Sequence, residues 1–167
     1  MEKIQDYWVE PFLTLIELCK IKPNESIIVL TETRSRELNV IILEQAIKKI
    51  GLEFNKIEIP SKPYLIDPII KSTGSSNILD GNNLYIKKLK ESDIIFDLTK
   101  EGLMHSKQTK EILSSGTRIM NISDEHPEIL SRLKPDIDLK DRVKEAVSQC
   151  RGSSIMKVTS DAGTNLK

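Results

Sequence analysis

The sequence is poor in several residue types from which functional sites are often built. Its 167 residues include two histidines, two cysteines and one tryptophan, and aromatic residues make up only 4%. Cys19 and Cys150 lie far apart and neither belongs to a CxxC pair, so we expect packed free thiols on helix faces and a reducing compartment, not a zinc or redox centre. A non-haem iron site needs two histidines and one carboxylate, and this chain has two histidines in total.

A dominant charge and a long apolar run are also absent. Lys+Arg and Asp+Glu both number 25, so the formal net charge is zero and no nucleic-acid footprint is visible. No segment approaches the roughly 20 apolar residues of a membrane span, and the acidic residues among the first twelve positions do not fit a signal peptide. We therefore expect a soluble, cytoplasmic protein that binds neither nucleic acid nor membrane.

Apolar residues that are present recur with two periods. A three-to-four-residue spacing predicts helices with one buried face, at residues 6–20, 37–50, 83–90, 106–115, 126–133 and 138–150. Short β-branched or apolar runs predict buried strands, at 26–31, 54–59, 93–98, 118–122 and 154–159. The strand at 54–59 alternates and precedes Pro60, which places it near a sheet edge.

This alternation of strands and helices predicts an α/β fold. We expect a three-layer sandwich, in which a mostly parallel, Rossmann-like sheet of about five strands carries helices on both faces. The length suits a single domain over residues 1–167. Residues 61–83, rich in Pro and Gly, are interpreted as a surface excursion with a short helix near 67–71, in preference to a mobile lid.

Phosphate-binding motifs are missing after the first strand. Neither GxGxxG nor GxxxxGK[ST] occurs, so a dinucleotide or P-loop site is not predicted. The loop at 31–36 could hold an anion through Arg34 and Arg36, although an ordinary solvated loop is favoured because charged side chains are mostly exposed. The polar segment at 158–166 contains Asp161, for which we predict a turn.

The best candidate for a functional site is the stretch SDIIFDLTKEGLMHS, residues 92–106. A buried strand opens here into a loop with Gly102 and His105, and ligands in open α/β sheets bind at the carboxyl ends of strands. His105 suits a general acid or base near neutral pH, although a structural role is equally expected. His126 lies at a helix start where Asp124 is the predicted N-cap and Pro127 an early helical residue, so we expect it to be structural.

Five segments together resemble one protein group in order and spacing: DIIFDLT, GLMHS, SSGTRIMNIS, LKPDIDLKDRV and VTSDAGTNL. They are similar to the amino-terminal half of the superfamily that contains the aminopeptidase T-like metallopeptidases and the dihydroxypyridine ring-cleaving dioxygenases. The dioxygenase branch is slightly closer. The resemblance implies an α/β domain that precedes a second domain bearing most of the metal ligands.

The resemblance also implies chemistry and site residues. In the dioxygenase branch an iron ion opens a pyridine ring with molecular oxygen, and in the peptidase branch a pair of divalent metals such as zinc or cobalt hydrolyses a peptide bond. Leu103 or Met104, together with His105, match residues that line the dioxygenase pocket. Those metal ligands lie downstream of the segments matched here, so we expect this chain alone to bind no metal or other cofactor.

Two functions remain open at this point. The chain is either the wall of an active-site cleft completed by a C-terminal metal-binding domain or a separate chain, or a non-catalytic module for small-ligand binding or oligomerisation. Because the resemblance places the metal ligands elsewhere, we expect this chain alone to have no metal-dependent activity. An apolar face left for a second domain would favour homo-oligomers.

Overall fold

The computed structural model describes residues 3–63, 73–122, 124–133 and 138–167. The chain divides into two compact units, residues 1–134 and residues 135–167, which are described one by one. The predicted short helix near 67–71 lies outside the described residues.

The first unit is built on a four-stranded parallel sheet. Its strands are β1 (Ile27–Glu32), β2 (Asn55–Ile59), β3 (Ile94–Asp97) and β4 (Arg118–Asn121), in the spatial order β2-β1-β3-β4. The predicted parallel sheet is confirmed, and β2 lies at an edge as expected. The chain runs outward from β1 to β2 and from β3 to β4, so the topological switch point lies between β1 and β3.

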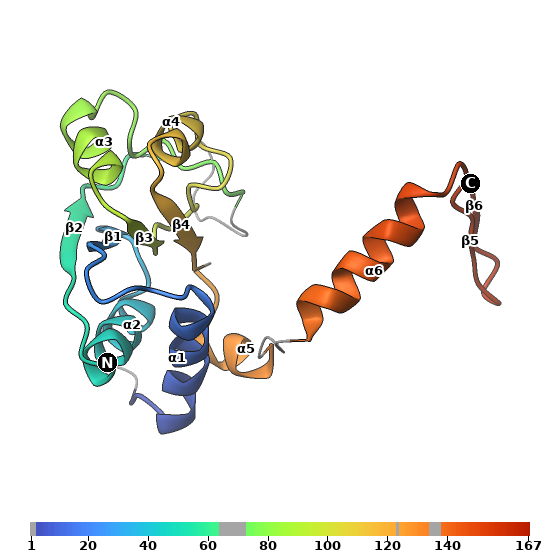
Figure 1. Ribbon diagram of the computed structural model, residues 1–167, viewed down its shortest axis with the longest axis horizontal. Helices are drawn as coiled ribbons and strands as arrows, with labels where there is room; N and C mark the ends of the chain where they lie inside the picture. The colour runs from blue at the N-terminus through green and yellow to red at the C-terminus, as the bar shows by residue number, and fades with distance from the viewer. Residues whose placement is uncertain (1–2, 64–72, 123, 134–137) are drawn as a thin grey trace. The chain divides into compact units, whose positions relative to one another are not determined.

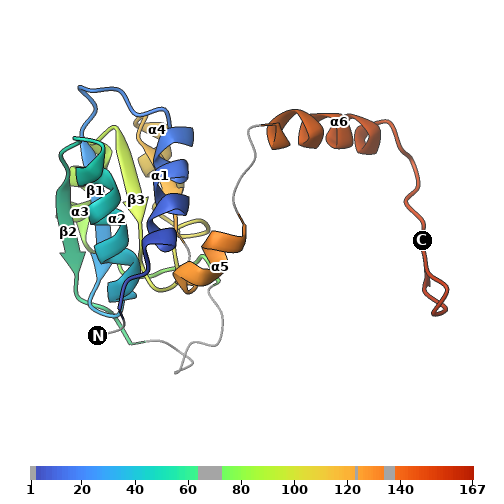
Figure 2. The same cartoon turned by 90° about the horizontal axis from the view of Figure 1, so that it is seen from below.

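Helices cover both faces of this sheet, which confirms the three-layer α/β architecture (Figure 1). One face carries α1 (Val9–Leu18) and α2 (Glu37–Lys49), which lie side by side (Figure 2), and the other carries α3 (Asn83–Lys90) and α4 (Thr109–Ser114). The short helices η1 (Asp6–Trp8) and α5 (Pro127–Arg132) contact each other.

Side-chain alternation in the central strands explains the two cores. Ile27 and Val29 of β1 pack with α1 and α2, whereas Ile28 and Leu30 pack with α3 and α4. Successive side chains of a strand point to opposite faces, so a continuous apolar run serves both helical layers at once. The parallel pairing of β1 with β3 places the carboxyl ends of both strands at one edge of the sheet.

The start of α5 differs from the prediction. His126, not Asp124, is the N-cap, and its Nδ1 accepts a hydrogen bond from the Glu128 backbone N–H at 3.2 Å. Asp124 is instead paired with Lys100 and Arg36. Pro127 is the first helical residue, as predicted.

The second unit contains α6 (Leu139–Arg151) and a small hairpin of β5 (Val158–Thr159) and β6 (Asn165–Leu166). The predicted strand at 154–159 is therefore shorter and pairs in an antiparallel hairpin, not with the parallel sheet. The predicted turn is confirmed, because the Gly163 N–H donates to the Ser160 carbonyl at 3.0 Å.

The two thiols are both free, but they differ in environment. Cys19 is half-buried against the core of the first unit, as expected for a packed thiol. Cys150 is exposed on α6, so its predicted packing is not observed. No helix in the described ranges has both the length and the apolar character to cross a membrane.

Candidate functional site

The loop that follows β3 lies beside the topological switch point. β3 ends at Asp97, and residues 98–108 form the connection to α4. Because β1 and β3 are parallel neighbours, the loop after β3 lies next to the loop after β1. The carboxyl edge between two such strands is where open α/β sheets hold ligands.

Asp97 anchors this loop from inside the protein. Its side chain is fully buried, and its Oδ1 accepts hydrogen bonds from the N–H and the hydroxyl of Thr99 at 3.0 and 2.7 Å. Its Oδ2 accepts from the Leu103 N–H at 2.6 Å and from Asn121 Nδ2 at 2.9 Å. Burial raises the pKa of Asp97, and the hydrogen bonds from Thr99 and Leu103 oppose that rise. One carboxylate therefore fixes both the start and the middle of the loop.

Gly102 allows the loop to turn tightly against β4. Its φ of +77° lies in the left-handed region, which favours glycine because it lacks Cβ. A Cβ at this position would lie 2.5 Å from Asn121 Nδ2, which itself donates to Asp97. The loop conformation thus depends on a glycine next to the Asn121 amide that donates to Asp97.

The switch point itself is closed by hydrogen bonds between loops. Glu32, at the end of β1, is 2% exposed, and its carboxylate accepts from the Lys100 N–H at 2.6 Å and from the Ser61 hydroxyl at 2.5 Å. Ser35 donates its hydroxyl to the Leu98 carbonyl at 2.7 Å. These contacts join the segments that follow β1, β2 and β3 into one rigid edge.

Arg36, one of the two arginines considered for anion binding, is engaged by the protein itself. Its Nε donates to the Asp124 carbonyl at 2.9 Å, and its guanidinium lies 3.8 Å from the Asp124 carboxylate. The Lys100 ammonium also pairs with Asp124. These contacts link the loops after β1, β3 and β4 and agree with an ordinary structural loop.

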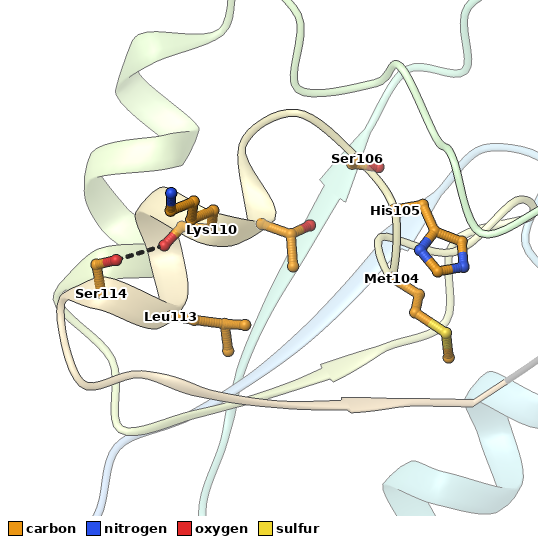
Figure 3. Close-up of a pocket in the computed structure, with 7 residues that line it drawn as sticks. Met104, His105, Ser106, Lys110, Leu113 and Ser114 are labelled. Atoms are coloured by element: carbon orange, nitrogen blue, oxygen red, sulfur yellow. Dashed lines mark hydrogen bonds between the residues drawn. The ribbon is translucent and has the colours of Figure 1, made fainter. Parts of the chain in front are cut away.

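An open pocket of about 440 Å³ lies where the GLMHS loop meets α4 (Figure 3). Its lining residues are Met104, His105, Ser106, Thr109, Lys110, Leu113 and Ser114. Met104 and His105 lie next to each other at one end of this pocket in Figure 3. The pocket therefore combines the thioether, imidazole and hydroxyl groups of the loop with hydroxyl, aliphatic and ammonium groups of α4.

The three predicted site residues are in different environments. Met104 is 62% exposed and His105 is exposed, so both are available to a ligand. Leu103 is fully buried in the core between the sheet and the α3–α4 layer. The structure thus brings Met104 and His105 together in the pocket and places Leu103 beneath it.

The residues described here do not form a metal centre. Among the described ranges, no three His, Cys, Asp or Glu side chains gather in a way that could hold a metal ion. The buried carboxylates at the carboxyl edge are instead occupied by protein donors: Glu32 by Lys100 and Ser61, and Asp97 by Thr99, Leu103 and Asn121. The donor set therefore does not fit the metal ion that the resemblance implies.

Sequence reasoning missed the residues that support the loop. Asp97 carried one usable signal, since an acidic residue inside an apolar strand run must find several donors when it is buried. Asn121 and Glu101 gave no such signal, because their partners lie about 20 to 30 positions away in the chain. The support is visible only once the strands are paired.

The chain is similar to known proteins of one family. A profile of the 2,5-dihydroxypyridine 5,6-dioxygenase family matches residues 7–167. The chain is similar to the 2,5-dihydroxypyridine 5,6-dioxygenase of Pseudomonas putida KT2440, with 26% identity over 156 residues that cover 92% of this chain and 44% of that protein. The solved structure of 2,5-dihydroxypyridine dioxygenase from the same strain is similar in fold, with a TM-score of 0.81 and 24% identity over 98% of this chain and 47% of that one.

The matches cover nearly all of this chain but only part of each relative. The chain spans about half the length of the two relatives. The family profile, by contrast, covers this chain from its first helix to its last residue. The chain belongs to the 2,5-dihydroxypyridine 5,6-dioxygenase family.

Proposed function

We propose that this chain is the N-terminal domain of a ring-cleaving dioxygenase that acts on a hydroxylated pyridine. In this proposal the carboxyl edge of the parallel sheet forms one wall of the active-site cleft. The observation that carries it is that Met104 and His105 lie together in an open pocket between the loop after β3 and α4, in a chain of this family. The matches favour this function over the aminopeptidase T-like branch and over a non-catalytic module.

His105 is the proposed acid or base of this wall. An exposed imidazole can take a proton from a ring hydroxyl, or return one, near neutral pH. Met104 offers an exposed, flexible thioether beside it, and such a group packs well against an aromatic ring. Leu103 has less support as a substrate contact because its side chain is fully buried. We propose that it anchors the loop to the core instead.

The metal ligands come from elsewhere in this proposal. A C-terminal metal-binding domain or a separate chain would contribute them, because the described residues do not fit a metal ion. The bound divalent metal, iron in the dioxygenase branch, would supply the chemistry with molecular oxygen. The part left to this chain is to bind and orient the ring and to hold or move a proton at His105.

Location and assembly complete the proposal. A cytoplasmic enzyme agrees with two free thiols in one chain. Homo-oligomers are supported by exposed apolar side chains along α6: Leu139, Val143 and Val147. These residues are also suitable for contact with a metal-binding domain.

Reconstitution of activity tests the function. The chain is combined with the metal-binding segment that completes it, in the presence of ferrous iron and oxygen, and the loss of 2,5-dihydroxypyridine is followed by absorbance. His105→Ala is expected to lower kcat by about 10²-fold or more, the usual contribution of general acid–base catalysis. Lys107→Ala, an exposed change in the same loop that does not line the pocket, is the matched control and should leave kcat near wild type. Equal activity of the His105 and Lys107 variants would overturn the role of His105.

A further inference from the structure

We propose that residues 73–76, here called the strap, position the imidazole of His105, with Gly74 as the contact and Glu101 as the anchor. The strap comes from a part of the chain about 30 residues before the loop that carries His105. The catalytic meaning of the inference rests on the proposed function, since it concerns the same histidine. The position of the imidazole relative to the strap does not depend on that function.

Backbone hydrogen bonds pair the strap with the GLMHS loop. The Gly74 N–H donates to the Glu101 carbonyl at 2.8 Å, and the Gly74 carbonyl accepts from the His105 N–H at 2.5 Å. The Ser76 N–H donates to the Gly102 carbonyl at 2.9 Å. The backbone of His105 is therefore held directly by the strap, in addition to the support that Asp97 gives to Leu103.

Side chains lock the two ends of this pairing. The Glu101 carboxylate, 8% exposed, accepts from both the N–H and the hydroxyl of Thr73 through Oε2, at 2.7 and 2.6 Å. At the other end the Ser106 hydroxyl donates to the Ser76 carbonyl at 2.6 Å, and both serines are buried. Hydrogen bonds to a buried carboxylate are among the stronger ones in proteins. The strap is thus fastened on both sides of His105.

Gly74 lets the strap pass close to the pocket side chains. Its φ is +72°, and a Cβ at this position would lie 3.2 Å from Cδ2 of His105 and 3.3 Å from Cβ of Met104. The space next to the imidazole is therefore shaped by the absence of a side chain at residue 74. Any side chain there would press on both residues proposed to meet the substrate.

This contact has a direct consequence for catalysis. An exposed histidine side chain normally samples several rotamers, and ordering it costs conformational entropy when substrate binds. A histidine whose backbone is held by the strap, with its ring beside Gly74, has lost part of that freedom, so less is lost on binding. Gly74, Thr73 and Glu101 are accordingly positioning residues, since they act on substrate only through His105 and Met104.

The chain offers a closely matched pair of variants for the test. Gly74→Ala and Gly81→Ala both place a Cβ on a glycine with φ between +72° and +77°, so the backbone strain is alike. A Cβ on Gly81 meets no atom within 4 Å, whereas a Cβ on Gly74 meets His105 and Met104. The difference between the two variants therefore isolates the contact with the site.

The measurement is ¹H–¹³C NMR of the histidine rings and methionine methyl groups in the ligand-free full chain. The two histidines of the sequence give two ring systems, so His126 is an internal reference for His105. We expect Gly74→Ala to move the Cδ2–Hδ2 signal of His105 and the methyl signal of Met104, while Gly81→Ala leaves both at their wild-type positions. Unmoved signals in Gly74→Ala, or equal movement in both variants, would overturn the inference.

A second set of variants covers the case in which Gly74→Ala does not fold. Thr73→Val removes the hydroxyl bond to Glu101 at nearly constant volume, and Thr14→Val removes an unrelated hydroxyl bond to the Glu10 carbonyl in α1. Only Thr73→Val should move the His105 signals, and Glu101→Gln, which keeps an acceptor oxygen, should disturb them less than Glu101→Ala. If the His105 signals stay at their wild-type positions in both Thr73→Val and Glu101→Ala, the strap does not position His105.

The reconstituted enzyme then separates this inference from the proposed function. If the strap positions His105, Thr73→Val lowers kcat by about tenfold with little change in KM, as expected for a misplaced catalytic group. Should His105→Ala prove fully active, the proposed acid–base role of His105 fails while the NMR result on the strap still stands. Should Thr73→Val move the NMR signals but leave kcat unchanged, positioning of His105 for catalysis is refuted.

Discussion

Two aspartates flank β3, and the protein uses them in opposite ways. Asp93, at the amino end, is exposed, and its Oδ2 accepts from the N–H and the hydroxyl of Ser26 at 2.7 and 2.8 Å, bonds that lower its pKa. Asp97, at the carboxyl end, is fully buried, and burial raises its pKa although four hydrogen bonds reach its carboxylate. The same residue type thus stabilises a charge near water at one end and anchors a loop inside the protein at the other.

The difference between the two aspartates shows that this fold buries carboxylates at the carboxyl edge of the sheet. A buried carboxylate is costly unless it is fully hydrogen-bonded, and the carboxyl edge holds three such groups: Glu32, Asp97 and Glu101. All three accept bonds from loop backbone or hydroxyl groups near the candidate site. Buried carboxylates that lower the stability of the fold and gather at one edge of a sheet are typical of functional sites.

Removal of the two aspartates tests this comparison most strongly. Asp97→Ala leaves the Leu103 N–H, the Thr99 groups and the Asn121 amide without their buried acceptor, and it should lower the free energy of unfolding by about 3 kcal/mol. Asp93→Ala should cost clearly less, because water can replace the exposed acceptor. Urea unfolding of both variants measures the difference, and equal losses would contradict the proposed asymmetry.

A smaller effect is expected at the glycine beside Asp97. Gly102→Ala places a Cβ 2.5 Å from Asn121 Nδ2 and strains a residue at φ +77°, so we expect a loss of about 2 kcal/mol. Gly116→Ala is strained alike at φ +97° but its Cβ meets nothing within 4 Å, so a loss of about 1 kcal/mol is expected. Thermal unfolding compares the two variants, and a Gly102 variant no less stable than the Gly116 variant would count against a tightly packed loop.

Glu128, which lies away from both ends of β3, is a third carboxylate whose effect on stability depends on pH. Glu128 accepts from the Tyr7 hydroxyl at 2.6 Å and from Trp8 Nε1 at 2.9 Å, and these bonds with Arg132 lower its pKa to about 2. Its pKa in the folded protein lies below the usual glutamate value of 4.5, so its stabilising effect is present above about pH 4.5 and is lost as the pH falls towards 2. Asp97, with its raised pKa, acts in the opposite sense.

Glu128→Gln should therefore flatten the acid side of the stability curve. We expect the variant to be less stable than wild type near neutral pH and to approach it as the pH falls, because protonation removes the same contribution from the wild type. Urea midpoints measured across the acid range check this, with Glu17→Gln on α1 as an exposed control. A constant gap between variant and wild type at all pH values would show that the charge of Glu128 is not responsible.

Much of the fold follows from local sequence patterns. The β-branched run that forms β1 and the amphipathic segment that forms α3 were predicted to within one residue, because burial on two faces and on one face leave different periods. The fifth strand was assigned from the same kind of run, but its residues pair within a short hairpin. Local pattern gives the type of an element and leaves its pairing partner open.

The candidate site was predictable only in part. Its place at the end of β3, and the exposure of His105, follow from the order of strand, glycine and histidine in one short stretch. The direction of Leu103 into the core does not, because a one-residue shift within an irregular loop exchanges inside and outside. The same holds for the strap, whose contacts join residues 73–76 to residues 101–106 across a β-strand and a helix. Such long-range hydrogen bonds leave no periodic trace in the sequence.

The central claim, that the end of β3 forms a wall for a hydroxylated pyridine ring, is tested most directly by ligand titration. The full chain is labelled at its methionine methyl groups, and 2,5-dihydroxypyridine is added without oxygen while ¹H–¹³C spectra are recorded. Met104 and Met156 are 62% and 76% exposed, so Met156 serves as a control for non-specific contact. We predict a saturating shift of Met104 with a Kd in the millimolar range, about −4 kcal/mol, weakened by His105→Ala, and no shift of Met156. A Met104 signal that does not move, or that moves no more than Met156, would contradict the account.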